Sequence, residues 1–223
     1  MPNNYGPRIV TDGLVLCLDA GNTKSYPSSG TTWTDISRNG INGTLTNGPT
    51  FNSANGGSIV FDGVDDSVST TRTSTTSFTW IAWFRTNVVS SGFRNIISVR
   101  TPSYMLMLMD DDSANMGFWA SDTLTTGPSL NMTGISTNVW YHATFVREGN
   151  SITNGYKTYM NGSFRGSANT GTWSSSDPII IGARTDATQF FNGNIASIQI
   201  YNRALSATEI LQNYNATKGR FKL

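Results

Sequence analysis

Apolar and polar side chains alternate with a period of two along several stretches of the chain. Between Phe78 and Arg85 both alternating sides carry bulky apolar side chains, including two tryptophans. A period of two is typical of a β-strand, and bulk on both faces favours a central strand in a sandwich of two packed sheets. Residues 139–147 show the same alternation and predict a second strand of this kind.

Residues 194–201 also alternate, and they predict a strand that leads directly into a short helix. Ser206 is followed three residues later by Glu209, just before the apolar residues Ile210 and Leu211. Ser-x-x-Glu at this position is typical of a capping box, in which each side chain binds the backbone N–H of the other residue. Strict alternation assigns one strand face to Ala196, Ile198 and Ile200 and the other face to Ile195, Ser197, Gln199 and Tyr201.

Short apolar runs between turn residues predict the other strands. Asn161-Gly162 follows the run 156–160 and is the strongest short signal for a hairpin turn. Together these segments predict an all-β fold, a two-sheet antiparallel β-sandwich with one short C-terminal helix. The remaining predicted strands are 13–20, 58–61, 95–99, 104–109, 116–120 and 178–182.

The segment 21–57 consists mainly of turn-forming residues. It contains four Asn-Gly pairs and two prolines, both of which are signals for turns. We therefore expect a long connection that is ordered by function, by a metal or by packing. Its expected anchors in the core are Trp33, Ile36, Ile41, Leu45 and Phe51.

Composition narrows the classes of partner. Charged residues make up 13% of the chain and the net charge is +1. These values do not indicate a basic surface, so nucleic acid is not an expected partner. No apolar run approaches the roughly 18 residues of a transmembrane helix, and the first ten residues do not resemble a secretory signal. Cys17 is the single cysteine, so an intrachain disulfide is excluded and a buried apolar role is expected.

Eight segments in a fixed order resemble the laminin-G-like jelly roll of the concanavalin A-like lectin/glucanase group. They are GLVLCLDAGN, TTWTDISRNGINGTL, SIVFDGVDD, SFTWIAWFR, VWYHATFVREG, YKTYMNGSFRG, PIIIGAR and FFNGNIASIQIYNRALSATEI. The resemblance covers about Gly13 to Ala216. The resemblance implies a two-sheet antiparallel jelly roll with one concave sheet and ligand-binding loops at one rim. We expect one domain at 13–218, an N-terminal arm at 1–12 and a C-terminal tail at 219–223.

The opening of this region is similar to versions found in structural proteins of tailed bacteriophages. The similar stretch is LDAGNTKSYPSSGTTWTDISRNGINGTL, residues 18–45. It implies a virion surface component (a decoration, fibre or tail protein) that is assembled in the host cytoplasm and docks on capsid or tail proteins. Further expectations from this resemblance are a homo-oligomer and binding of cell-surface glycans.

Candidate catalytic residues are few. Glucanases of this group resemble one another in a Glu-x-Asp-x-(x)-Glu strand motif, which places a nucleophile and an acid/base on one face. The chain lacks this motif and has two glutamates, Glu148 in a turn and Glu209 in the capping box. A Ser-His-Asp triad would need His142, the only histidine, which we expect to be packed and hydrogen-bonded within a strand. We therefore predict a non-enzymatic structural or adhesion protein.

Two alternatives stay open. The first is a stand-alone carbohydrate-binding lectin of a cell. Such a lectin would have the same fold and would also lack the glucanase motif. The second is an atypical glycoside hydrolase that uses a pair of aspartates, for example within Asp110-Asp111-Asp112, although a solvated hairpin tip is the simpler interpretation of that run.

Asp and Asn side chains in several turns predict a structural calcium ion. Calcium takes about six to eight oxygen ligands from carboxylates, amides and backbone carbonyls, and members of the resembled family commonly hold one at the sheet rim. The alternative is that these residues are turn formers. The candidate ligands are Asp19, Asn22, Asp35, Asn39, Asp65 and Asp66.

A glycan site is expected to stack an aromatic ring on a sugar, with Asn and Asp side chains near its hydroxyls. Trp173 is the first candidate, and the alternative is that it anchors its own loop. Trp80, Trp83 and Trp140 lie in predicted strands and are expected in the core. The candidate ligand-binding aromatics are Trp173, Trp119, Tyr26 and Phe190.

Overall fold

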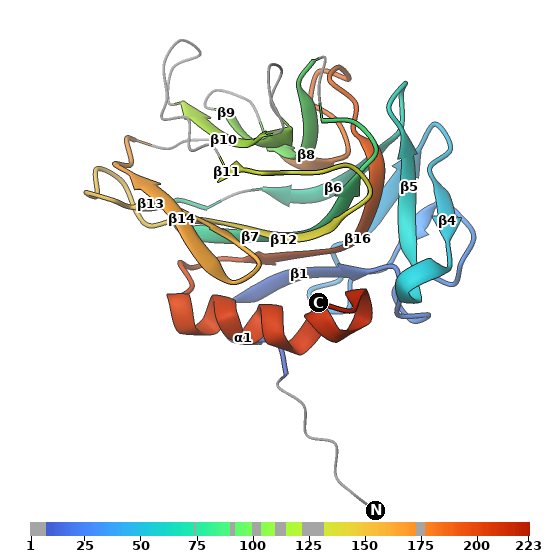
Figure 1. Ribbon diagram of the computed structural model, residues 1–223, viewed down its shortest axis with the longest axis horizontal. Coiled ribbons are helices and arrows are strands. Elements are labelled where there is room, and N and C mark those ends of the chain that lie inside the picture. The colour runs from blue at the N-terminus through green and yellow to red at the C-terminus, as the bar shows by residue number, and fades with distance from the viewer. Residues whose placement is uncertain are drawn as a thin grey trace, which may run out of the picture.

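Two antiparallel β-sheets pack face to face in the computed structural model (Figure 1), which describes residues 8–73, 75–89, 92–99, 104–109, 115–121, 132–172 and 177–223. The strands of the first sheet, here called sheet I, are β1 (Leu14–Asp19), β4 (Thr50–Asn52), β5 (Ser58–Asp62), β7 (Phe78–Thr86), β12 (Trp140–Arg147), β13 (Tyr156–Met160), β14 (Ser163–Ala168) and β16 (Asn192–Tyr201). They run in the order β14-β13-β12-β7-β16-β5-β4, and β1 also pairs with β16.

Sheet II lies opposite sheet I and has the order β11-β10-β9-β8-β15-β6-β3-β2. The predicted two-sheet antiparallel sandwich with a single short C-terminal α-helix is therefore confirmed. The strands of sheet II are β2 (Thr32–Trp33), β3 (Gly43–Thr46), β6 (Ser67–Thr73), β8 (Arg94–Val99), β9 (Tyr104–Met109), β10 (Asn115–Ser121), β11 (Met132–Thr133) and β15 (Pro178–Ile181). The helical elements are η1 (Ala54–Gly56), α1 (Ala207–Thr217) and η2 (Lys218–Phe221).

The main core fills the space between the two sheets. Trp80 of β7 packs against Phe118 of β10, with ring centroids 6.2 Å apart, and both side chains are buried. Met107 and Met109 of β9 lie in the same core. Large aromatic side chains bury about 150–250 Å² each, so these contacts between the sheets are a major source of stability.

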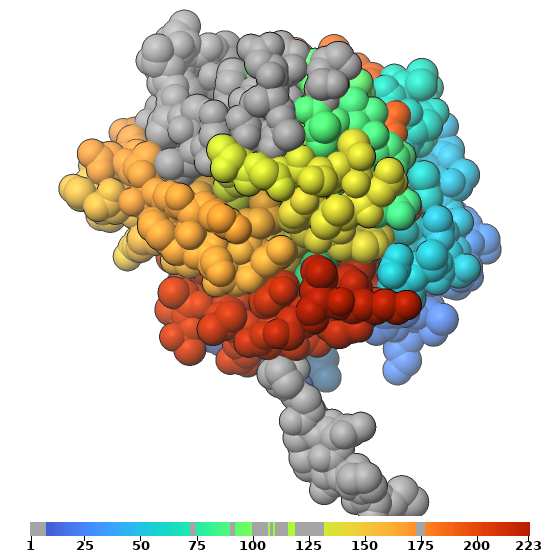
Figure 2. Space-filling model, in the orientation of Figure 1, coloured from blue at the N-terminus to red at the C-terminus, as the bar shows by residue number. Residues whose placement is uncertain are grey.

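The C-terminal helix covers the outer face of sheet I, on the side away from sheet II (Figure 1). Ile210 of α1 packs with Ile81 and Tyr201, and Phe221 of η2 packs with Trp83. In Figure 2 this C-terminal segment forms a continuous band beside the hairpin of β13 and β14. Both faces of β7 are therefore buried, one under sheet II and the other under the helix.

Strand β16 lies in the middle of sheet I and contains a β-bulge. Its first half pairs with β5 and its second half with β1, whereas β7 runs along its other edge. The register with β7 shifts at Ala196, so Ile195 joins Ile198 and Ile200 in the main core while Ala196 lies under the C-terminal segment. The prediction that Ala196 shares a face with Ile198 is wrong, because one extra residue reverses the alternation.

The segment 21–57, expected to be a long connection, contains the three short strands β2, β3 and β4. They extend both sheets at their edges. Trp33 and Leu45 are buried, as predicted, and Ile41 and Phe51 pack against the same core.

Two predicted local motifs are confirmed. The Glu209 backbone N–H donates to Ser206 Oγ at 3.3 Å, and the Ser206 backbone N–H donates to the Glu209 carboxylate at 2.8 Å. These two bonds form the capping box of α1. Asn161 and Gly162 have φ values of 52° and 77°, the positive range that a two-residue hairpin turn requires.

The domain boundaries expected near residues 12 and 218 stay a prediction. Beyond each of them one side chain is buried in the fold, Val10 on the N-terminal side and Phe221 on the C-terminal side. Within the described part of the chain, every helix is too short or too polar to cross a membrane.

Candidate functional site

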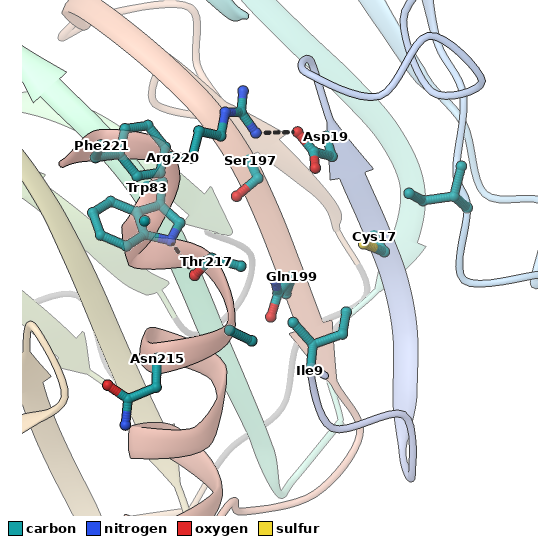
Figure 3. A pocket seen from close by; sticks show the side chains of 13 residues that line it. Ile9, Cys17, Asp19, Trp83, Ser197, Gln199, Asn215, Thr217, Arg220 and Phe221 are labelled. Carbon is teal, nitrogen blue, oxygen red and sulfur yellow. Dashed lines mark hydrogen bonds and ion pairs between the residues drawn. The ribbon is translucent and has the colours of Figure 1, made fainter. Parts of the chain in front are cut away.

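A cavity of about 420 Å³ lies between the outer face of sheet I and the C-terminal segment (Figure 3). Strands β1, β7 and β16 form one wall, and α1 and η2 form the opposite wall. Small-molecule sites typically enclose about 300–1,000 Å³, so the size is appropriate for a ligand. The lining includes Ile9, Asp19, Trp83, Ser197, Gln199 and Arg220.

An ion pair between Asp19 and Arg220 joins the two walls. Arg220 Nη1 lies 2.5 Å from Asp19 Oδ1, which also accepts a hydrogen bond from the Gly21 backbone N–H at 2.9 Å. The other guanidinium nitrogens of Arg220 donate to the backbone carbonyls of Asn55 and Gly57. Every nitrogen of this guanidinium therefore has an acceptor within the protein.

Trp83 forms an aromatic wall of the cavity. Phe221 stacks on it with ring centroids 4.1 Å apart, and Trp83 Nε1 donates to Thr217 Oγ1 at 2.8 Å. The Thr217 hydroxyl in turn donates to the Asn213 carbonyl at 2.8 Å. These contacts hold the indole against the end of α1.

Two polar side chains of β16 point toward the C-terminal segment (Figure 3). Ser197 and Gln199 are only 6% and 4% exposed. Gln199 Oε1 accepts a hydrogen bond from the Tyr201 hydroxyl at 3.3 Å. Among the described residues, no hydrogen bond engages the Ser197 hydroxyl, and the Gln199 amide contacts only the Tyr201 hydroxyl, so both side chains keep capacity for a ligand.

Cys17 also lines the cavity, but its thiol is expected to be unreactive. Burial raises the pKa of its thiol to about 12, with a further contribution from the negative charges of Asp19 and Asp35. The thiolate is the reactive and metal-binding form of cysteine. The neutral Cys17 thiol therefore acts as a small apolar group, as expected.

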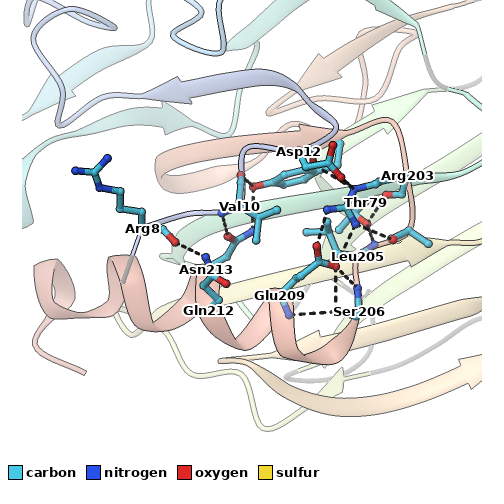
Figure 4. A network of polar contacts seen from close by, with 12 residues as sticks. Arg8, Val10, Asp12, Thr79, Arg203, Leu205, Ser206, Glu209, Gln212 and Asn213 are labelled. Atoms are coloured by element: carbon cyan, nitrogen blue, oxygen red, sulfur yellow. Dashed lines mark hydrogen bonds and ion pairs between the residues drawn. The ribbon is translucent and has the colours of Figure 1, made fainter. Parts of the chain in front are cut away.

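A polar network anchors the N-terminal segment and α1 to sheet I (Figure 4). Asn213 is fully buried; its side-chain oxygen accepts from the Val10 N–H at 2.8 Å, and its amide donates to the Tyr201 hydroxyl at 3.0 Å. At the start of the helix, Arg203 pairs with Glu209 at 2.5 Å. Hydrogen bonds from Arg203 lower the pKa of Glu209 to about 2.

The turn between β5 and β6 brings three carboxylates together. Ligand oxygens of Asp62, Asp65 and Asp66 lie within 4.8 Å of one another. Asp66 is buried, and its carboxylate accepts the Asp62 backbone N–H at 2.9 Å. Burial raises the pKa of Asp66, and the negative charges of its two neighbours add to the effect. Of the predicted calcium ligands, Asp65 and Asp66 therefore lie together, with Asp62 as a third carboxylate.

The other predicted calcium ligands do not join this turn. The Asp35 carboxylate accepts from the backbone N–H groups of Cys17, Ser37 and Ile41 and from the Ser37 hydroxyl, at 2.7–3.2 Å. Because a carboxylate has about four lone-pair positions, Asp35 has none left for a metal, and its assignment as a ligand is wrong.

Asp19, Asn22 and Asn39 also make contacts within the protein. Asp19 pairs with Arg220, Asn22 Oδ1 accepts from the Lys24 N–H at 3.0 Å, and the Asn39 amide donates to the Leu14 carbonyl at 3.2 Å. Their assignment to calcium stays a prediction.

The four candidate aromatics have different environments. Tyr26 is buried, packs on Phe51 with centroids 5.8 Å apart and donates from its hydroxyl to the Gly30 carbonyl. Its ring has no open face for a sugar, so that assignment is wrong. Phe190 is half-buried and stays a candidate. Trp173 and the side chain of Trp119 lie outside the described residues, as do Asp110-Asp111-Asp112.

His142 is packed beneath the helix, as predicted, against Trp83 at 5.1 Å and Tyr214 at 5.7 Å between ring centroids. The expected side-chain hydrogen bond is absent, because neither ring nitrogen has a partner among the described residues. Burial lowers the pKa of His142 to about 3. An enclosed imidazole with so low a pKa, and with neither ring nitrogen bonded to a described residue, is not arranged as the base of a triad.

Sequence reasoning missed the residues that form the cavity. Ser197 and Gln199 were visible as polar positions on the outward face of a strand, but nothing in the pattern showed that a helix end would enclose them. No sequence pattern identified Arg220 as a cavity residue, because its partner Asp19 is 201 residues away in the sequence.

Comparison with known proteins agrees with this architecture. A model described as the concanavalin A-like lectin/glucanases superfamily matches residues 41–211. Domain 4 of AbnA, a GH43 extracellular arabinanase from Geobacillus stearothermophilus solved with arabinotriose, is 17% identical with a TM-score of 0.70, over 90% of this chain and 98% of that chain. Among curated proteins, no sequence match was found.

Larger proteins contain the same fold as one part. The receptor-binding domain of botulinum neurotoxin type G is 19% identical with a TM-score of 0.70, over 91% of this chain and 51% of that chain. A sialidase from Trypanosoma rangeli, solved with sialic acid, is 16% identical with a TM-score of 0.67, over 93% of this chain and 33% of that chain. The present chain thus spans about half of the toxin chain and a third of the sialidase. Because the family model covers most of the chain and the two-sheet architecture agrees with it, this chain belongs to the concanavalin A-like lectin/glucanase superfamily.

Proposed function

We propose that this chain is a carbohydrate-binding domain that does not catalyse a reaction. The observation that carries the proposal is the superfamily match over residues 41–211. Further support comes from the arabinanase domain solved with arabinotriose, which is similar over nearly its whole length. Arabinotriose is therefore the first probe of choice.

The positions of the two glutamates support a role without catalysis. Glu148 pairs with Lys157 at 3.0 Å, and Glu209 caps α1 while it pairs with Arg203. Retaining and inverting glycosidases need two facing carboxyl groups, one of them free to donate a proton. Neither glutamate meets that requirement in this fold.

The test of binding is a panel of glycans and bacterial-surface polysaccharides, run once with calcium and once with a chelator. Retention of at least one neutral glycan without release of reducing ends is the expected result. Loss of binding in chelator would support calcium at the turn of Asp62, Asp65 and Asp66. No binding under either condition would contradict the proposal.

We further propose that the domain acts on the surface of a tailed-phage virion, docked on capsid or tail proteins. The support is the resemblance of residues 18–45 to phage structural proteins. Mass spectrometry of purified particles should then detect the chain. Its absence from particles, together with its presence in a cell fraction, would favour a stand-alone cellular lectin.

The acidic turn supports a second candidate, an atypical glycoside hydrolase. Asp66 is buried beside two exposed carboxylates, and burial raises its pKa, which is the direction that suits a general acid. Release of reducing ends from a polysaccharide, abolished by Asp66→Asn, would establish this activity. Asp177→Asn, an exchange outside the turn, is the matched control.

A further inference from the structure

We propose that the cavity beneath the C-terminal segment is a carbohydrate site that takes one or two uncharged sugar units. This inference rests on the proposed carbohydrate-binding function and names its location. The site is on the outer face of sheet I, between β16 and the end of α1, and it is separate from the acidic turn at Asp62, Asp65 and Asp66.

The charges in the cavity favour a neutral ligand. Asp19 and Arg220 are the charged residues of the lining, and they neutralise each other at 2.5 Å. Arg220 also donates to two backbone carbonyls, so each of its three nitrogens already binds an acceptor and its positive charge is offset within the protein. A charged ligand would have to break these contacts or lose its hydration without compensation.

The free polar groups suit hydroxyl ligands. Ser197 and Gln199 are two residues apart on β16, which places their side chains on the same face, about 7 Å apart along the strand. Each is at least nine-tenths buried. Among the described residues, none engages the Ser197 hydroxyl, and the Gln199 amide contacts only the Tyr201 hydroxyl. The hydrogen-bonding capacity that Ser197 and Gln199 keep at the cavity wall is available to a sugar hydroxyl. Asn215 adds an exposed amide at the same cavity.

The rest of the lining suits the C–H face of a sugar ring. Ile9 and Ile36 contribute aliphatic surface beside the buried rings of Trp83 and Phe221, which stack on each other. Carbohydrate sites combine apolar surface with a few oriented polar groups. The cavity volume of about 420 Å³ is more than ten times the roughly 30 Å³ share of one water molecule in the liquid. There is room for a ligand of one or two rings.

The test compares two tryptophan substitutions on the same helix. Ala216 lines the cavity, whereas Leu211 is 46% exposed and does not. Ala216→Trp should fill the cavity and weaken binding of L-arabinose, D-galactose, D-glucose and arabinotriose at least tenfold, as measured by calorimetry. Leu211→Trp should bind as the wild type does. Ser197→Ala combined with Gln199→Leu should also weaken binding tenfold or more. Sialic acid is included as a negatively charged ligand for comparison with the neutral sugars.

A local signal reports occupancy independently of affinity. The indole N–H of Trp83 should shift in a ¹H–¹⁵N spectrum on addition of the bound sugar, because this residue lines the cavity; the resonance is identified by its loss in Trp83→Phe. Circular dichroism confirms that each variant is folded.

The outcomes separate the site from the function. Sugar binding that is equal in wild type, Ala216→Trp and Leu211→Trp, with no Trp83 shift, would overturn this site and leave the proposed function standing. Preference for sialic acid over the neutral sugars would overturn the assignment of an uncharged ligand. If the wild type binds no sugar in the panel, both proposals fail.

Discussion

At the scale of single residues, His142 makes the stability of the fold depend on pH. It is the only histidine of the chain, and burial lowers its pKa from 6.5 to about 3. Below pH 6.5 the unfolded chain takes up a proton that the folded protein excludes. The free energy of unfolding should therefore fall by about 1.4 kcal/mol per pH unit as the pH drops below 6.5.

Urea unfolding between pH 8 and pH 5 measures how the free energy of unfolding changes with pH. Most carboxylates titrate below this range. His142→Phe keeps a ring between Trp83 and Tyr214 and has no proton to bind. The slope should flatten in this variant. A slope that persists unchanged would show that another group causes it.

Asp35 should contribute more to stability than an exposed aspartate. Asp35→Ala removes the acceptor for three backbone N–H groups and one hydroxyl. Because buried donors without partners are costly, we expect a loss of about 2–4 kcal/mol in the free energy of unfolding. Asp65→Ala, at an exposed position, is the control and should change it by less than about 0.5 kcal/mol. Equal effects in the two variants would contradict this role of Asp35.

At the scale of elements, η2 stabilises the outer layer of sheet I. Phe221 is 6% exposed and stacks on Trp83. Phe221→Ala should lower the free energy of unfolding by about 3 kcal/mol, as expected for the loss of a buried aromatic side chain. Leu223→Ala, two residues further and 47% exposed, should have little effect. Chemical denaturation measures the free energy of unfolding of the two variants. If Phe221→Ala leaves this free energy unchanged, η2 contributes little to stability.

The elements that were predicted correctly have strong local patterns. Strands β7 and β12 alternate over most of their length, α1 has its capping box, and the β13–β14 hairpin has Asn161-Gly162. Strand β6 was missed because its sequence, SVSTTRT, contains a single apolar residue, Val68. The bulge at Ala196 was missed because an inserted residue leaves no trace in a regular alternation.

The candidate site was harder to predict than the fold. Its polar groups come from β1, β16, α1 and η2, and the pairing of Asp19 with Arg220 joins residues 201 positions apart. Contacts of this kind depend on how sheets and helices pack, and no local pattern reports them. Asp35 was assigned to calcium because its residue type suits that ion, but its carboxylate binds backbone N–H groups instead.

At the scale of the whole molecule, the two layers of core should unfold together. Strand β16 contributes Ile198 to the main core and Tyr201 to the layer under α1. Heating should therefore give coincident transitions in far-ultraviolet circular dichroism and in tryptophan fluorescence. A separate early transition in fluorescence would show that the helix layer melts first.

The central place of β16 has a consequence for biosynthesis. This strand is close to the end of the chain, yet both β1 and β7 pair with it, and contacts of the outer layer join residues 203 positions apart. A ribosome must translate β16 before sheet I can close, because β1 and β7 both pair with this strand. Until then the edges of β1 and β7 stay open, so the nascent chain is exposed to misassociation and folding is slow. Chaperones that shield open strand edges should therefore raise the yield of this domain.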